Sequence, residues 1–420
     1  YMLVGGSNFD DWASRETTQT YDFNSAIHED GSVGEKYQRL AAIGHMLREH
    51  GARLMRAETV SLAFTNSNPT VQIAARRAQD GGLYLFVRTE NRSGPQTGRV
   101  VISAGVEGAP LAFDYELEPF GSKIFYLPLG VTDAKHGEWL PKLLPPSKPS
   151  AELPSAIVLT QVESMADPLP KKWTPLTPGD TLENHGVMDR HFVYYRVRPA
   201  PGEAFAVHRL GDHVIKDTKA DGVLALTAGQ RLPVQASDTN AVTFIAPTNA
   251  TEVVLLYENR GLQHHPTPTL EQNWRNGIRA VTVGTNAMPL EFATGERDRG
   301  IAFSADHPAT DAAWRREIIG QSTGDSGALL QWYRLQFELP ESTAVKSVIW
   351  HLRLEATGNG FIYLNERCLG RYWEAGPQTD FYLPESWLNF GAGKTNRIVL
   401  SLRPTQTNAV VRAAAIIPAD

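Results

Sequence analysis

The chain has 420 residues, a net charge of −6 and a pI near 6.1, so nothing in its charge favours binding to nucleic acid or to an acidic membrane surface. No apolar stretch approaches the roughly 20 residues of a spanning helix, and we expect no membrane insertion. Cys368 is the only cysteine, which excludes an internal disulfide and a cysteine-based metal cluster. A chain of this length should hold about three domains.

The first 30 residues carry a strand signal followed by a loop rich in polar and aromatic side chains. Tyr1–Val4 is a short apolar run that ends at Gly5-Gly6, a pattern that suits a buried strand. The segment from Asn8 to Asp22 then contains acids, aromatics and an arginine. Loops at strand ends often hold such groups for chemistry, so we expect a functional loop here.

A helix is predicted to begin after this loop. Ser32-Val33-Gly34-Glu35 fits a capping box, in which Ser32 and Glu35 would satisfy free backbone amides. Gly51 is placed where a helix would end. Apolar or small side chains at helical spacing predict the buried face, namely Tyr37, Leu40, Ala41, Gly44 and Leu47. Together these features predict one β/α unit, which cannot be stable alone because both strand edges would lack partners.

The rest of the chain is predicted to be mainly β-structure. Alternating apolar residues and turn clusters predict a small β-sandwich over 58–140, and a proline-rich linker follows over 141–155. Two further β domains, resembling jelly rolls, are expected over 156–284 and 285–420. The predicted strands are 71–75, 82–88, 100–103, 111–117, 123–127, 192–198, 213–215, 223–226, 241–246, 252–257, 332–339, 347–354, 361–364, 379–383 and 397–402.

Three motifs in this order resemble glycoside hydrolase family 35, the β-galactosidases. They are YMLVGGSNF with TYDFNSAI and EKY near the start, LLYENRG at 255–261, and GNGFIYLN with LGRYW, GPQ and YLP over 358–384. The resemblance implies that residues 1–57 are the end of a (β/α)8 catalytic barrel and that the two later domains are galactose-binding-like jelly rolls. We therefore expect a C-terminal piece of a longer enzyme, whose remainder is its main partner.

The same resemblance implies where a β-galactoside or related oligosaccharide would bind. Tyr1 matches a family tyrosine that points into the galactose pocket, and Phe23 stands where most members have a second tyrosine. Its ring keeps an apolar surface for a sugar but lacks the hydroxyl. Trp12 and Asn8 lie in the same loop and are further candidates for lining the pocket.

The resemblance implies retaining hydrolysis by two glutamates held about 5 Å apart. In the family, these glutamates come from barrel strands that precede the segment present here, so we assign no catalytic residue in this chain. The acidic residues of the first loop are instead expected to be solvated or capping groups. We expect no cofactor and no metal, and a periplasmic or secreted location.

A non-catalytic β-rich module that binds carbohydrate or supports a partner is the alternative to the hydrolase. Exposed aromatics would serve such binding, and the candidates are Trp274, Tyr372, Trp373 and Trp387. Burial in a sandwich core or interface competes with that role, because large aromatics usually fill such places. Cys368 is expected to be a small buried filler.

Overall fold

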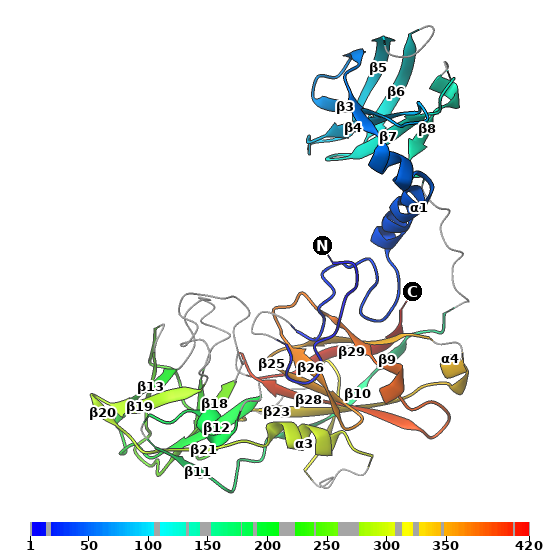
Figure 1. The fold of residues 1–420 in the computed structure, drawn as a ribbon. Helices are drawn as coiled ribbons and strands as arrows, with labels where there is room; N and C mark the ends of the chain where they lie inside the picture. Colours follow the sequence, from blue (N-terminus) through cyan, green and yellow to red (C-terminus); the bar gives the residue numbers. More distant parts are fainter. Residues whose placement is uncertain are drawn as a thin grey trace. The chain divides into compact units, whose positions relative to one another are not determined.

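The computed structural model describes residues 2–13, 18–104, 110–131, 134–142, 153–177, 179–187, 191–209, 223–238, 241–258, 277–306, 313–321, 327–345, 348–405 and 408–419. The described residues are mainly β-structure and divide into two compact units (Figure 1). One unit holds residues 1–4 and 24–149, and the other holds residues 5–23 and 150–420. Tyr1, Trp274, the strand predicted at 213–215 and most of the proline-rich linker lie outside the described residues.

The first unit contains a helix and a small β-sandwich. The helix α1 spans Glu35–Arg56, and the 3-10 turn η1 spans Ala134–His136. One sheet has the order β1-β3-β4-β7-β8 and the other the order β2-β5-β6. The strands are β1 Glu58–Val60, β2 Ala63–Asn66, β3 Val71–Arg77, β4 Leu83–Thr89, β5 Gln96–Ala104, β6 Leu111–Leu117, β7 Ser122–Leu127 and β8 Glu138–Leu140. Apolar side chains from both sheets form the core between them.

The predicted helix exists, but its ends and its buried face differ from the prediction. Gly34 is the N-cap and no side chain caps it, so the expected capping box does not form. Gly51 lies inside the helix, which runs on to Arg56. The buried face is Ala42, Met46 and His50, which packs on the sandwich through a second small cluster. The predicted apolar face is largely exposed, because tertiary contacts decide which of two helix faces is covered.

The expected strand at Tyr1–Val4 is wrong for the described residues of that run. Val4 forms a single isolated bridge with Ile27, and Ile27 donates a backbone hydrogen bond to Leu3. A strand persists when a ladder of hydrogen bonds joins it to at least one neighbour, and the described part of this segment makes only an isolated bridge.

The second unit contains two β-sandwiches. The first, called the middle sandwich, has sheets ordered β11-β21-β12-β18-β14-β15 and β16-β17-β13-β19-β20. Its strands are β11 Thr174–Leu176, β12 Phe192–Val197, β13 Ala204–Arg209, β14 Leu224–Thr227, β15 Gln230–Arg231, β16 Ala236–Ser237, β17 Ala241–Ile245, β18 Val253–Glu258, β19 Ile278–Val283, β20 Asn286–Ala287 and β21 Leu290–Ala293, with the turn η2 at Leu182–His185.

The other sandwich of the second unit is called the C-terminal sandwich. Its two sheets have the strand orders β22-β10-β23-β28-β25-β26 and β27-β24-β29-β9. Its strands are β9 Ile157–Leu159, β10 Gln161–Ala166, β22 Arg315–Ile318, β23 Gln331–Glu338, β24 Trp350–Ala356, β25 Asn359–Leu364, β26 Arg367–Tyr372, β27 Asp380–Leu383, β28 Thr395–Arg403 and β29 Val411–Pro418. Its helices are α3 Glu296–Phe303, α4 Glu341–Val345 and the turn η3 Glu385–Trp387.

Residues 157–166 join a different domain from the one that the sequence indicated. They were expected in the domain over 156–284, but β9 pairs with β29, and β10 pairs with β22 and β23 of the C-terminal sandwich. Conversely, β21 lies beyond residue 284 and pairs with β11 and β12 of the middle sandwich. Strand pairing between distant segments has no local sequence signal, so a boundary drawn by order along the chain misses such exchanges.

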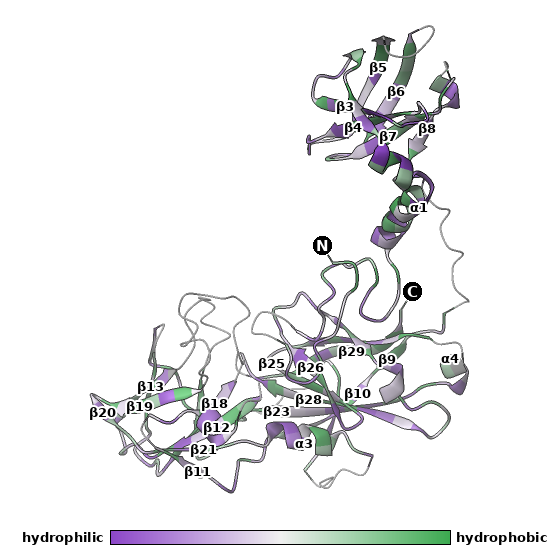
Figure 2. Ribbon diagram, viewed as in Figure 1, coloured by the Kyte–Doolittle hydropathy of each residue, from purple (hydrophilic) through white to green (hydrophobic). Residues whose placement is uncertain are grey.

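The two sandwiches of this unit share a buried contact. Apolar side chains on the outer faces of β12, β18, β23, β25 and β28 form one cluster, which includes Phe192, Tyr194, Trp332 and Tyr363. The strands at this contact are apolar on both faces, since β18 is buried at every position, and Figure 2 shows hydrophobic segments along the strands of both sandwiches. No helix among the described residues is long and apolar enough to cross a membrane.

Candidate functional site

The first loop of the chain is fastened to the C-terminal sandwich. Within residues 5–23, called the N-terminal loop, Ser7 pairs with Thr20, and Asn8 donates a backbone hydrogen bond of 2.6 Å to Gln19. The Gln19 amide donates to the Tyr382 carbonyl at 3.0 Å, and the Gln378 amide donates to Gln19 at 2.8 Å. The loop is thus held on the sandwich by buried amide groups rather than by apolar contact alone.

Gly370 on β26 allows the loop backbone to approach closely. Its φ is +134°, and a Cβ atom added there would lie 2.8 Å from the carbonyl oxygen of Asn8. A side chain would therefore both strain the strand and push the loop away. Nearby, Phe9 packs against Trp387 with ring centroids 4.9 Å apart. Trp387 is thus half-buried by this contact.

A cluster of ionisable side chains lies under the loop. Arg297, in the first turn of α3, donates two hydrogen bonds to the carboxylate of Asp10, one of them 2.8 Å long. His191 Nδ1 lies 3.0 Å from Glu296, and Tyr363 donates to the other oxygen of Glu296 at 2.8 Å. All three side chains are buried, namely His191, Glu296 and Tyr363. A buried charged group is unfavourable unless it is paired, so the Glu296 carboxylate needs the two partners it has here.

The cluster changes the proton affinities of its members. Burial alone would lower the pKa of His191, but the carboxylates of Asp10 and Glu296 outweigh it and raise the pKa to about 9. Burial alone would raise the pKa of Asp10, but the neighbouring His191 and the hydrogen-bonded Arg297 outweigh it and lower the pKa. Burial, reinforced by the nearby negative charges, raises the pKa of the Cys368 thiol well above its usual value. Without a metal, the cluster therefore holds an imidazolium and a neutral thiol at neutral pH.

The structure places the predicted substrate-binding residues in different environments. Asn8 ties the loop together, since its side chain donates to the Thr18 carbonyl at 3.1 Å. Trp12 is 76% exposed and Phe23 is 59% exposed, with Phe23 edge-on to Tyr21 at 4.9 Å between centroids. Tyr1 lies outside the described residues. Thus Trp12 and Phe23 expose apolar ring surface, while Asn8 holds the loop together.

Sequence reasoning missed the ionic cluster. It treated Asp10 as a solvated acid and Cys368 as a filler, and it gave no role to His191, Glu296 or Arg297. Cys368 is buried as expected, but it lies beside Asp10. These residues come from four separate segments, so no spacing motif could have joined them.

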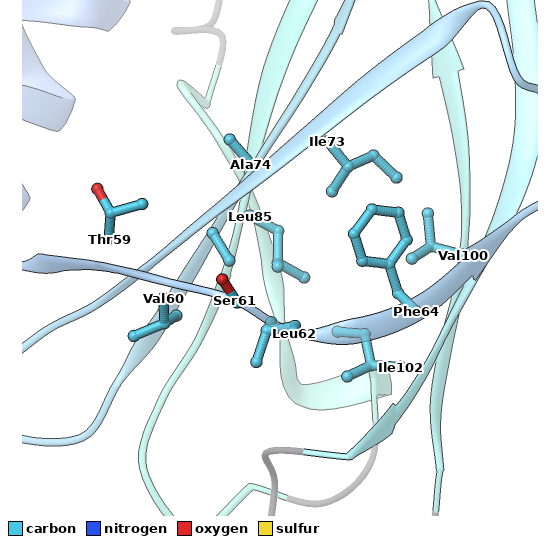
Figure 3. A pocket seen from close by; sticks show the side chains of 11 residues that line it. Thr59, Val60, Ser61, Leu62, Phe64, Ile73, Ala74, Leu85, Val100 and Ile102 are labelled. Carbon is cyan, nitrogen blue, oxygen red and sulfur yellow. The ribbon is translucent and has the colours of Figure 1, made fainter.

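A cavity of about 270 Å³ lies in the small sandwich of the first unit. Figure 3 shows the side chains around it, which are mostly aliphatic, with the hydroxyls of Thr59 and Ser61 at one side. Phe64 and Ile73 line it from the two sheets. A sugar site needs several convergent hydrogen-bonding groups, and this cavity lacks them, so it is a poor candidate for sugar binding.

Residues 330–393 match the family model "Beta-galactosidase, galactose-binding domain". The chain is 38% identical to Beta-galactosidase-1-like protein 3 of Rattus norvegicus over 141 residues and 42% identical to that of Mus musculus over 140 residues. It is 28% identical to Probable beta-galactosidase B of Aspergillus terreus over 142 residues. These alignments cover about a third of this chain, namely 32%, 32% and 33%.

The alignments span a fifth or less of those relatives, namely 19%, 19% and 13% of their lengths. Among solved structures, a GH31 alpha-xylosidase from Xanthomonas citri aligns with 86% of this chain and 35% of its own at 10% identity, with a TM-score of 0.16. That score is too low to support an argument about fold. The matched domain contains Tyr363, Cys368 and Gln378, and therefore holds part of the surface on which the N-terminal loop rests.

Proposed function

Since the chain carries the galactose-binding domain of the β-galactosidases and resembles the C-terminal portion of glycoside hydrolase family 35, we propose that it works as part of a retaining exo-glycosidase. The enzyme would release terminal β-galactosyl residues. The chain's contribution is the N-terminal loop, which presents Trp12 and Phe23 to the sugar. Both catalytic glutamates would lie in a barrel segment that is not part of this sequence.

One observation carries the proposal. The loop that holds the expected sugar-binding side chains is anchored on the domain that matches the family model, through Gln378 and through the Asp10 network. Trp12 and Phe23 remain exposed although aromatic surface of this size is normally buried. An aromatic ring that stays accessible on a rigid support suits stacking against the apolar face of a pyranose.

The exposed face of α1 supports the proposal that a barrel segment belongs to the same enzyme. The exposed side of α1 carries four apolar side chains at helical spacing, Tyr37, Leu40, Ile43 and Leu47. The opposite side already packs on the small sandwich. Contiguous exposed apolar surface marks an interface, and a barrel whose last helix is α1 would cover it.

The alternative is a carbohydrate-binding module without catalysis. The position of the family match favours this alternative. The match lies wholly within a galactose-binding domain. Under this alternative the chain binds a galactoside, and the protein that contains it does not hydrolyse it. A periplasmic or secreted location stays a prediction under either function.

The experiment compares the native protein with the 420-residue chain. Intact mass and N-terminal sequencing of the native protein should show several hundred residues upstream that contain the two glutamates. The native protein should hydrolyse p-nitrophenyl β-D-galactoside with retention at the anomeric carbon, which NMR detects, and the 420-residue chain should not. Galactoside binding by a native protein that lacks both hydrolysis and the upstream segment would replace the enzyme with the binding module.

A further inference from the structure

Three side chains with metal-binding atoms converge beneath the N-terminal loop. Asp10 comes from the loop, His191 directly precedes β12, and Cys368 lies on β26. One ligand atom from each lies within 4.8 Å of the other two. Asp10 and Cys368 are also joined by a backbone hydrogen bond of 3.1 Å from the Asp10 amide to the Cys368 carbonyl. The backbone therefore fixes two of the three residues side by side before any ligand binds.

The third residue is oriented for a ligand. His191 is 4% exposed, and its Nδ1 atom faces Glu296 at 3.0 Å. This contact directs Nε2 toward Asp10, 3.7 Å away, and Nε2 has no hydrogen-bond partner within the part of the chain that the structure describes. A buried ring nitrogen without a hydrogen bond is unfavourable. A carboxylate that holds one histidine nitrogen while the other faces a metal is the usual arrangement at protein metal centres.

The donor set selects the kind of ion. Thiolate and imidazole ligands favour Zn²⁺ over Ca²⁺ and Mg²⁺, which prefer oxygen. In a tetrahedral Zn²⁺ site with bonds of about 2.0–2.3 Å, neighbouring ligand atoms lie about 3.3–3.8 Å apart. The 3.7 Å between His191 and Asp10 already fits. We propose that Asp10, His191 and Cys368 bind one Zn²⁺ ion, with the fourth position open to water, and that this ion fastens the N-terminal loop to the two sandwiches.

Charge balance agrees with this assignment. A thiol releases its proton when it binds a metal, which offsets part of the charge that Zn²⁺ brings. The remaining positive charge would face the carboxylates of Asp10 and Glu296, which lie on either side of His191. A metal at this site would differ from the expectation, drawn from the sequence, that the chain binds no metal.

Cobalt substitution tests the site directly. Because Cys368 is the only cysteine, a thiolate-to-Co²⁺ charge-transfer band in the near ultraviolet can arise from this residue alone. The metal-free 420-residue protein should bind one Co²⁺ with this band, and Zn²⁺ should displace it stoichiometrically. Cys368→Ser should abolish the band, and His191→Gln and Asp10→Asn should each weaken binding at least tenfold. Glu296→Gln should weaken it about 10- to 100-fold, as expected for a group that orients a ligand.

The matched control is His185→Gln. His185 lies 3.5 Å from Asp180 at a more accessible place, without a thiol nearby, so this change should leave Co²⁺ affinity unaltered. Circular dichroism verifies that each variant is folded. The absence of a thiolate band in the unaltered protein would overturn the proposal whatever the variants do. A band that persists at full affinity in folded His191→Gln would also overturn it.

Discussion

The guanidinium of Arg297 donates hydrogen bonds to both carboxylate oxygens of Asp10, and the bond from Nε is 2.8 Å long. The two residues are 287 positions apart in the sequence. Asp10 lies in the N-terminal loop and Arg297 in the first turn of α3, so this pair joins the start of the chain to the C-terminal sandwich. Both side chains are about one-third exposed, which allows some solvent screening. The pair therefore positions the loop more than it stabilises the whole domain.

Arg297→Ala should loosen the N-terminal loop. A two-pronged ion pair of this exposure contributes on the order of 1 kcal/mol, so the free energy of unfolding should fall by about that amount in denaturant titrations. Limited proteolysis should cut within residues 5–23 more readily. Arg316→Ala is the control, because Arg316 is far more exposed and its pair with Glu163 is 3.8 Å long. Equal effects from the two changes would contradict the anchoring role.

The cluster should make loop anchoring depend on pH in chelator-treated protein. The pKa of His191 is raised from 6.5 to about 9, so its stabilisation is complete below pH 6.5 and is lost as pH rises toward 9. The pKa of Asp10 is lowered, so its contribution is present above about 3.8 and is lost as pH falls below that value. The groups that face His191 in this titration are Asp10, Glu296, Arg297, Tyr363 and Cys368.

Unfolding free energies measured between pH 6 and 10 should show that decline. His191→Gln should flatten it, because Gln carries no proton that titrates in this range. A decline of the same size in His191→Gln would assign the pH dependence to another group.

Phe23→Tyr should raise kcat/KM for a galactoside in the native protein if the missing hydroxyl is what limits recognition. Phe23 is 59% exposed, so stability should change by less than about 0.5 kcal/mol. Trp12→Ala should lower kcat/KM and leave the melting temperature unchanged, because its side chain is 76% exposed. Rates that stay the same in both variants would remove these residues from the proposed pocket.

The two faces of α1 should respond differently to truncation. Met46→Ala removes a buried side chain and should cost about 2–5 kcal/mol in the 420-residue chain. Leu47→Ala should cost less than about 0.5 kcal/mol there, since Leu47 is 52% exposed. In the longer native protein, a barrel that covers this face would make Leu47→Ala as harmful as Met46→Ala. A negligible cost in both proteins would count against a barrel at that face.

Local patterns predicted many strands well. The strand expected at 111–117 is β6, with the same bounds. Those expected at 123–127 and 397–402 are β7, which begins one residue earlier, and β28, which is longer by two residues at its start and one at its end. The helix also exists where its periodicity placed it. Its capping box does not form, because the helix begins at Glu35 with Gly34 as the N-cap, which leaves Ser32 two residues before the cap position. Within the candidate site, the sequence pointed to the N-terminal loop as a whole but not to Asp10 as the residue that anchors it.

The sequence by itself determined the β-rich class, most strand positions and a resemblance to a known family, because alternation of apolar residues and short motifs are properties of short segments. Only the tertiary structure decided which face of α1 is buried, that residues 157–166 complete the C-terminal sandwich, and that Asp10, His191 and Cys368 meet. The buried face of α1 depends on contacts with β4, β7 and β8, and the other two features depend on contacts between segments more than a hundred residues apart. Such contacts follow from packing and strand pairing over the whole fold, and no local pattern encodes them.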